Sequence, residues 1–394
     1  MSIDLRVAHT DELERFARLR EQGYAIPVNQ RSGWIERVST TGRTERLVGA
    51  FDGDRLVGML NVLAFEQWFG GRAVPMGGVA SVVVAPEERG RGIAPRMLAF
   101  ALTLMAERGE VVSTLGPATT WAYRKCGWEL AGHYGVVSVR TADLVGLAEG
   151  STRERRATTA DRDGMIAAYD RAAPSHPGFL ARPTWLWDER LEDAPNRFTY
   201  VVERDARIEG YVTYNESAVP RGINVWVDDL VGTDADAQRT LWRHLGAHLA
   251  QAEHVTVAGV PLDALEHLLP EQRIKPLGQQ VWMTRILDVV GAIAARGFAP
   301  AARADVSFRL RDPFAPGNEG SWRLIVEDGR GRIEPAATEP DAVLTVNGLG
   351  ALYTGWSSSA VLLDSGMAQG LSAAEAITLD AVFSGRRPVM SDDF

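Results

Sequence analysis

A short β-branched run that leads straight into a glycine-rich turn and a helix constrains this chain more than any other feature. Val82–Val84 predicts a strand, Gly90 and Gly92 lie in the turn, and Ile93–Arg108 has the pattern of a helix. A turn of this kind directs several backbone N–H groups at one point, and the helix dipole adds positive potential there. The segment therefore predicts an anion site.

The chemistry around the turn favours a pyrophosphate. Arg89 and Arg91 add charge-assisted donors, and glycine lets a phosphate approach the backbone closely. Two alternatives stay open at this point: a turn without a ligand, and a dinucleotide-binding turn. The second is disfavoured because Pro95 occupies the third glycine position of G-x-G-x-x-G. The Gly-Lys-Ser/Thr signature of a phosphate loop is absent from the sequence.

The chain of 394 residues is long enough for two to four domains. The charged, unpatterned stretch Ser151–Arg156 predicts a linker, and a second boundary is expected near Ile286. We therefore expect domains at 1–150, 151–285 and 286–394. Residues 47–60 and 199–214 carry similar strand pairs, which suggests a duplicated α/β domain with a mixed sheet.

Composition narrows the class of protein. A net charge of −9 argues against a nucleic-acid partner, and the single Cys126 rules out an intrachain disulfide and fits a reducing compartment. The sequence has neither an apolar leader nor a run long enough to cross a bilayer. We expect a cytoplasmic protein with no membrane partner.

Two segments around the anion site together resemble the GNAT acetyltransferase superfamily. Arg89, Gly92 and Ala94 occupy the three defining positions of its coenzyme A loop. The segment 122–128 resembles the family's Tyr-x-Lys-x-Gly-aromatic element, with Tyr123 at its tyrosine. The two segments also have the spacing seen in that superfamily.

A narrower resemblance is to the Eis (enhanced intracellular survival) group of these enzymes. It is carried by residues 65–72, 74–79, 281–288 and the final 392–394. It implies an α/β (α+β) fold of two tandem GNAT-like domains, the second degenerate, followed by a domain similar to sterol carrier protein. It also implies a homo-oligomer, a hexamer being one such form.

The same resemblance implies acetyl-CoA as co-substrate and a small-molecule or lysine amine as acceptor. Tyr123 would protonate the leaving thiolate, and the C-terminal carboxylate of Phe394 would be the base. Trp34 and Asp393 would line the acceptor pocket. The residues implied for the coenzyme are Val82, Val83, Val84, Arg89, Gly90, Arg91, Gly92, Ile93 and Ala94.

The chemistry explains why such groups are needed. A lysine-like amine has a pKa of ~10.4 and must lose a proton before it attacks a thioester. A terminal carboxylate of pKa ~3.5 is a weak base, so it could instead orient the ammonium group. In place of the family's Ser-Glu pair the chain has Ala118 and Thr119, which puts the acceptor in doubt. Polyamines, aminoglycosides and lysine are the implied acceptors.

Two other hypotheses remain open. The chain could be a non-catalytic protein that binds acyl-CoA or a lipid, or an enzyme for a longer acyl group. Cys126 reads as a buried thiol rather than a nucleophile. His244 and His248 have zinc-like spacing without the HExxH glutamate, so we expect surface or interface histidines and no metal. Phe394 is apolar, which predicts that the terminus docks.

Overall fold

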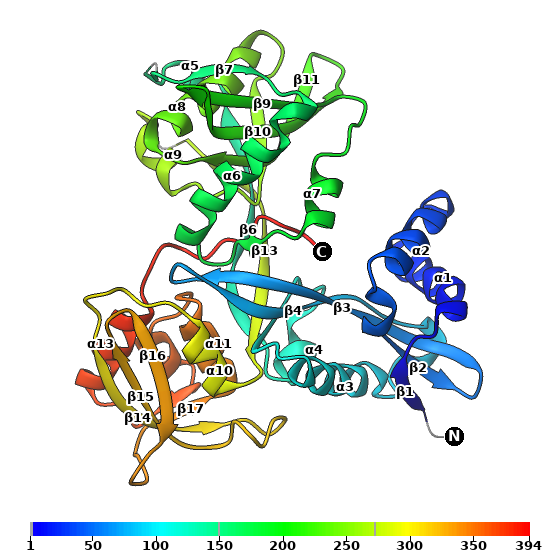
Figure 1. Cartoon of the computed structure of the whole chain (residues 1–394), viewed down its shortest axis with the longest axis vertical. Helices are drawn as coiled ribbons and strands as arrows, with labels where there is room; N and C mark the ends of the chain where they lie inside the picture. Colours follow the sequence, from blue (N-terminus) through cyan, green and yellow to red (C-terminus); the bar gives the residue numbers. More distant parts are fainter. Residues whose placement is uncertain (1–2, 149, 272) are drawn as a thin grey trace.

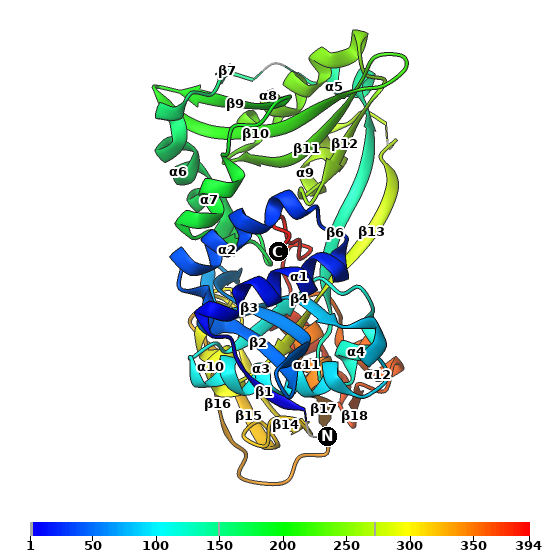
Figure 2. The same cartoon turned by 90° about the vertical axis from the view of Figure 1, so that its right-hand side faces the viewer.

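The computed structural model describes residues 3–148, 150–271 and 273–394. It consists of three parts, and the C-terminus lies where they meet (Figures 1 and 2). Among the described residues, no helix has the length and apolar character needed to cross a membrane. In the same part of the chain, no cluster of three or more histidine, cysteine or acidic side chains could hold a metal ion.

The N-terminal part is a strand-rich layer with helices on both faces (Figure 1). Its strands are β1 (Asp4–Val7), β2 (Leu47–Asp52), β3 (Arg55–Phe69), β4 (Arg72–Val84), β5 (Val112–Leu115) and β6 (Glu129–Arg140). Its helices are α1 (Leu13–Tyr24), α2 (Arg31–Thr40), α3 (Ile93–Glu107) and α4 (Thr120–Arg124). The short helix α5 (Thr141–Val145) follows β6 and lies with the middle part (Figure 1).

The middle part has a similar layered build. Its strands are β7 (Arg153–Arg156), β8 (Leu180–Ala181), β9 (Arg197–Arg204), β10 (Arg207–Ala218), β11 (Ile223–Gly232), β12 (His254–Ala258) and β13 (Lys275–Ile286). Its helices are α6 (Arg162–Ala172), α7 (Thr184–Arg190), α8 (Ala235–Gly246) and α9 (Asp263–Leu268). The parallel pair β11–β12 corresponds to the parallel pair β4–β5 of the first part.

The two parts share one 13-stranded sheet. Its order is β1-β2-β3-β4-β5-β13-β6-β12-β11-β10-β9-β7, with β8 paired to β3. Strand β13 therefore inserts between β5 and β6, so a segment near residue 280 completes the sheet of the first part. Because β6 and β13 run through both parts (Figure 1), the parts are joined by backbone pairing as well as by packing.

The C-terminal part packs a five-stranded sheet of order β16-β15-β14-β17-β18 against helices. Its strands are β14 (Ala304–Arg311), β15 (Gly320–Glu327), β16 (Arg330–Pro335), β17 (Val343–Thr345) and β18 (Ala368–Gln369). Its helices are α10 (Val289–Ala295), α11 (Val346–Tyr353), α12 (Ser359–Asp364) and α13 (Ala373–Phe383).

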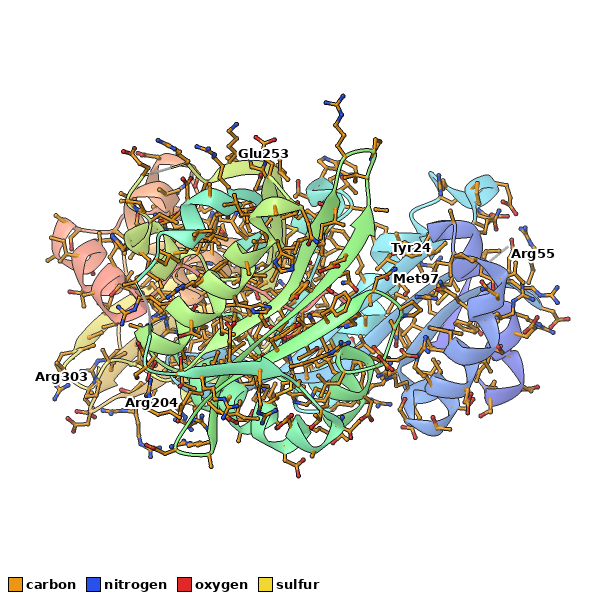
Figure 3. The ribbon with its side chains drawn as sticks, turned by 90° about the horizontal axis from the view of Figure 1, so that it is seen from above. Tyr24, Arg55, Met97, Arg204, Glu253 and Arg303 are labelled. Carbon is orange, nitrogen blue, oxygen red and sulfur yellow. The ribbon has the colours of Figure 1, made fainter. Side chains whose placement is uncertain are left out.

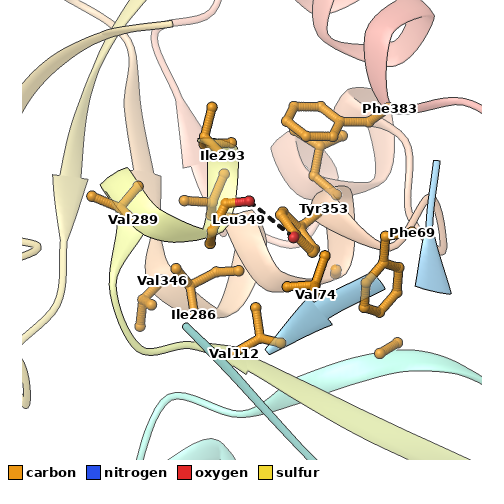
Figure 4. Packing of buried hydrophobic residues seen from close by; sticks show 14 of the residues in the cluster. Phe69, Val74, Val112, Ile286, Val289, Ile293, Val346, Leu349, Tyr353 and Phe383 are labelled. Carbon is orange, nitrogen blue, oxygen red and sulfur yellow. Dashed lines mark hydrogen bonds between the residues drawn. The ribbon is translucent and has the colours of Figure 1, made fainter. Parts of the chain in front are cut away.

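A continuous apolar core ties this last part to the first. The ring of Phe69 on β3 packs edge-on against Tyr353 on α11, with ring centroids 5.3 Å apart. The Tyr353 hydroxyl donates to the Ala292 carbonyl at 3.0 Å, the bond dashed in Figure 4. A buried hydroxyl with a partner avoids the cost of a lost hydrogen bond, so the aromatic cluster stays fully packed.

After α13 the chain runs back between the parts. The N–H of His133 on β6 donates to the Pro388 carbonyl at 3.2 Å, and the N–H of Val389 donates to the Pro177 carbonyl at 2.9 Å. These backbone bonds hold the last residues against both β6 and the middle part. The predicted docking of the terminus is confirmed, since the half-buried Phe394 packs on the hydrophobic core.

Two sequence-based expectations were wrong. The stretch Ser151–Arg156 is not a simple linker, because Arg153–Arg156 pairs with β9 as an edge strand. Its Arg155 is held by Asp161, with N···O distances of 2.7 and 2.8 Å.

His244 and His248 are buried rather than exposed. Their carboxylate neighbours are Glu154, 3.4 Å from His244, and Glu216, 3.3 Å from His248. Helical spacing alone did not show that β9 and β10 cover this face of α8.

Candidate active site

Strand β4 is the backbone of the site. It pairs with β5 only from Met76 to Gly78. Its register with β3 shifts near Asn61, where Ser81 takes a positive φ of 51°. A bulge of this kind bends the strand and re-aims its next residues. Beyond it, Val82–Val84 line a groove whose other wall is α4.

The groove has a volume of 510 Å³ and ends at the glycine-rich turn. It is lined by Gly23, Val82, Val83, Val84, Glu88, Arg89, Gly90, Gly92, Ile93, Ala94, Pro95, Leu98, Ala118, Thr119, Trp121, Ala122, Tyr123 and Lys125. Gly90 and Gly92 have φ values of 81° and 71°, a backbone conformation that residues with a side chain rarely adopt. Because Gly92 is the N-cap of α3, the free N–H groups of that helix face the groove.

Arg89 and Arg91 lie differently. Arg89 lines the groove, whereas Arg91 is turned to the side and pairs with Glu88 and, at 3.5 Å, with Asp52. Arg55 contacts the same Glu88 carboxylate, and these two arginines are the main causes that lower its pKa. Of the coenzyme residues named from the sequence, Arg91 is the one that does not reach the groove.

Trp121 was not singled out from the sequence. It is 67% exposed at the edge of the groove, and the Nζ atom of Lys125 lies 3.6 Å from its ring centroid. A large aromatic that stays exposed beside a pocket is a candidate ligand contact. Its position one residue after α4 begins, on a helix too short for periodicity, carried no signal.

A second cleft of 410 Å³ adjoins the groove. It is lined by Arg20, Tyr24, Ile26, Val79, Ala80, Ser81, Val82, Gly116, Tyr123, Asp393 and Phe394. Tyr24 lies on the side of the N-terminal part nearest the rest of the molecule, and Arg55 on its outer edge (Figure 3). The two cavities share Val82 and Tyr123, so both groups face the boundary between them.

Tyr123 is held by a tight turn after α4. Its carbonyl accepts the N–H groups of Cys126 at 2.9 Å and Trp128 at 3.2 Å, and Gly127 supplies the positive φ of 91° that this turn needs. Its ring packs edge-on against Trp128 at 6.4 Å. Burial raises the pKa of Tyr123 to about 12, so the hydroxyl keeps its proton at neutral pH.

The C-terminus forms one end of the second cleft. The Phe394 ring lies 5.0 Å from Phe65, and a Cβ on Gly78 would approach it to 2.7 Å. Only glycine at that position leaves room for the ring. Burial raises the pKa of the neighbouring Asp393. Trp34 does not line this cleft; it is buried, 5.6 Å from the Arg20 guanidinium.

A buried charge network fixes the terminal segment. The Nε atom of Arg182 donates to both carboxylate oxygens of Asp392 at 3.0 Å, and its Nη1 atom donates to Asp229 at 2.6 Å. Arg190 lies 2.7 Å from the Asp392 carboxylate and also donates to the Ser391 carbonyl at 2.7 Å. The arginines and Asp229 all belong to the middle part, which thereby holds the chain two residues before its end.

Known domain families match all three parts of the chain. The family described as "Acetyltransferase (GNAT) domain" matches residues 4–131, and a second family with that description matches 178–286. The sterol carrier protein domain family matches residues 289–391. An N-acetyltransferase of Streptomyces avermitilis is 31% identical over 90% of this chain and 90% of its own length. The chain belongs to the Eis-like GNAT N-acetyltransferases.

Further relatives and solved structures agree with that assignment. The N-acetyltransferase Eis of Mycobacterium tuberculosis is 28% identical over 91% of each chain. A GCN5-related N-acetyltransferase of Kribbella flavida is 33% identical and superposes with a TM-score of 0.88 over 100% of this chain and 98% of that one. Eis1 of Mycobacterium abscessus superposes with a TM-score of 0.82 at 26% identity, over 99% and 100%. The tandem GNAT and sterol-carrier-like fold predicted from the sequence is confirmed.

Proposed function

We propose that this Eis-like enzyme transfers an acetyl group from acetyl-CoA directly to an amine, with both substrates bound at once. The observation that carries the proposal is that Tyr123 lines both the groove and the second cleft. A proton donor at that boundary is within reach of a thioester on one side and an amine on the other. No covalent enzyme intermediate is then required.

The groove fits the coenzyme in shape and charge. In the described residues, β4 pairs with β5 over Met76–Gly78 only. Along Val82–Val84, the edge of β4 that faces away from β3 can therefore receive a pantetheine arm as an added strand. The N-terminus of α3, the two glycines and Arg89 fit a pyrophosphate, because N–H groups and a guanidinium converge there. Arg91 is omitted from this set because Glu88 and Asp52 engage it.

We assign three groups to the chemistry. The terminal carboxylate of Phe394 accepts a proton from the amine or orients the ammonium group. The deprotonated nitrogen then forms a bond to the thioester carbon. A backbone N–H of Val82–Val84, the stretch of β4 that lines the groove, donates to the carbonyl oxygen as negative charge develops. As the carbon–sulfur bond breaks, the Tyr123 hydroxyl donates its proton to the thiolate.

Polyamines, aminoglycosides and lysine-like amines are the acceptors that the family resemblance suggests, and we retain all three as candidates. We likewise retain as proposals the homo-oligomer and the domain limits 1–150, 151–285 and 286–394. The rival account is a protein that binds acyl-CoA without turning it over. That account needs the groove but gives no reason for a buried phenol facing a second cleft that also contains the chain terminus.

Thiol release from acetyl-CoA with amine acceptors tests the proposal. We expect Tyr123→Phe to lower kcat by about 100-fold, the usual scale for loss of a general acid, while coenzyme affinity stays unchanged. Trp356→Phe, a partly buried aromatic change in the C-terminal part, is the matched control and should leave kcat unchanged. Coenzyme binding without release for any amine would support the binding protein instead.

A further inference from the structure

The second cleft contains an arginine without a partner. Arg20 lines it, and no hydrogen bond or ion pair joins Arg20 to any residue in the described part of the chain. Its buried Nε atom is unsatisfied, and its guanidinium carbon lies 5.6 Å from the centroid of the Trp34 ring. Arginine in a half-buried position usually has a carboxylate or a carbonyl as its partner.

The neighbouring acids are already occupied. Glu21, the next residue along α1, receives two hydrogen bonds from Arg31 at 2.8 and 2.6 Å. Glu189 pairs with Arg37 at 3.5 Å, and the charge of Arg37 in turn acts on Arg20. Burial lowers the pKa of Arg20, and Arg37 lowers it further. Tyr24 and Glu21 act on the pKa of Arg20 in the opposite direction, but in the described residues neither forms a hydrogen bond or ion pair with it, so its guanidinium is available to a ligand in the cleft.

Arg43 is a second arginine with an unsatisfied guanidinium atom. Arg43 has a buried Nη2 atom without a partner in the described residues, and its guanidinium lies 3.6 Å above the Trp185 ring. Trp185 in turn contacts Phe65, which packs on Phe394. Arg43 does not line the cleft, so Arg20 is the arginine that a ligand there can reach.

The same cleft also has acidic lining groups. Asp393 and Phe394, which carries the terminal carboxylate, line it together with Tyr123. A ligand in the cleft thus meets both carboxylates and the Arg20 guanidinium. The carboxylates attract a polycation, whereas the guanidinium repels it.

We propose that the acceptor is a zwitterion of the amino-acid type, whose amine faces Phe394 and whose carboxylate is bound by Arg20. This inference rests on the proposed function and narrows its acceptor class. A planar guanidinium binds a carboxylate through two parallel hydrogen bonds, a geometry that fixes the ligand as well as attracting it. The cleft of 410 Å³ has room for an amino acid or for the end of a peptide.

Three acceptors that differ at one position test the idea. Lysine, lysinamide and cadaverine carry the same terminal amine, and only lysine has a free carboxylate. We expect kcat/KM for lysine to exceed that for lysinamide and cadaverine by roughly 10- to 100-fold, the range of a charge-assisted hydrogen bond. Arg20→Gln should remove most of that preference, because the lysine value falls and the cadaverine value rises as the repulsion is lost.

Arg18→Gln is the matched control, because Arg18 lies on the same helix but is exposed and paired with Glu14 at 3.1 Å. It should keep the preference for lysine. Equal rates for the three acceptors, or a preference that survives Arg20→Gln, would overturn the proposal while leaving the acetyltransferase in place. If none of the amine acceptors gives thiol release, the proposed function itself is refuted.

A stability measurement gives an independent test. Removing an unpaired, half-buried cation relieves a desolvation cost, so Arg20→Met should raise the melting temperature without ligand. The same variant should lose the stabilisation that lysine gives to the wild-type protein. A Gly-Lys dipeptide tests whether the bound carboxylate can belong to a peptide as well as to a free amino acid. It is acetylated as well as lysine only if the cleft accepts the end of a peptide. A lower melting temperature for Arg20→Met would contradict the account.

Discussion

The side chains of Arg182 and Asp392, 210 residues apart in sequence, meet in a fully buried ion pair, with Nε 3.0 Å from both carboxylate oxygens. Asp229 and Arg190 complete the network. Burying two charges is costly unless hydrogen bonds satisfy them. We therefore attribute the pair's role to positioning the end of the chain rather than to stabilising the fold. It fixes the chain two residues before the terminal carboxylate, which gives the middle part a role in the proposed reaction.

The first prediction follows from this pair. Asp392→Asn leaves Arg182 and Arg190 facing a neutral amide, so we expect the free energy of unfolding to fall by about 3 kcal/mol. The last two residues should lose their fixed position, and kcat should drop by more than about tenfold while coenzyme affinity is kept. Urea unfolding and steady-state kinetics measure both effects, with the exposed Asp364→Asn as control. An unchanged kcat would show that the pair is structural only.

The two arginines of the glycine-rich turn should behave differently. Arg89→Gln should raise KM for acetyl-CoA by about tenfold, because it removes a charge-assisted contact to the pyrophosphate. Arg91→Gln should change KM by less than about twofold, since Arg91 pairs with Glu88 and Arg55 still holds that carboxylate. Coenzyme titration at fixed ionic strength tests this. A larger effect for Arg91 than for Arg89 would contradict the assignment.

Stability should depend on pH through His176, which stacks on Phe179 at 4.8 Å. Burial, helped by the charge of Arg386, lowers its pKa to about 4, whereas an unfolded histidine titrates near ~6.5. Between those values the unfolded chain binds more protons. Stability is therefore complete above about pH 6.5 and falls toward pH 4, by about 1–2 kcal/mol after allowance for partial exposure.

His176→Gln should flatten the unfolding free energy over that interval. Histidines 133 and 244 have pKa values shifted in the same direction by burial, so some slope should remain. The exposed His267→Gln serves as control and should keep the wild-type slope. A wild-type slope in the His176 variant would assign the pH dependence to other groups.

Local features of the site were well predicted from the sequence. The helix expected at Ile93–Arg108 is α3, Ile93–Glu107, because the glycine-rich turn and Gly109 mark its ends chemically. The docking of Phe394 also followed from local character, since an apolar terminus gains by burial.

Features that depend on distant pairing were missed. Strand β13 inserts between β5 and β6, and no local pattern shows which strands it will join. Arg182 and Arg20 are ordinary arginines in the sequence, and their burial depends on segments brought together by the fold. The same holds for His244, whose helix face is covered by strands that come earlier in the chain. Periodicity reports which face is apolar, but not which polar groups the fold encloses.

The most direct test of the central account moves the terminal carboxylate without losing the Phe394 ring. Thiol release would be compared for the wild-type chain, the chain lacking Phe394, the chain extended by one glycine, and Phe394→Ala. The account predicts that deletion and extension both lower kcat by about 100-fold with coenzyme binding intact, whereas Phe394→Ala, which keeps a carboxylate at residue 394, retains more activity than either. Full activity in the glycine-extended chain would contradict the account, because the base would then lie elsewhere.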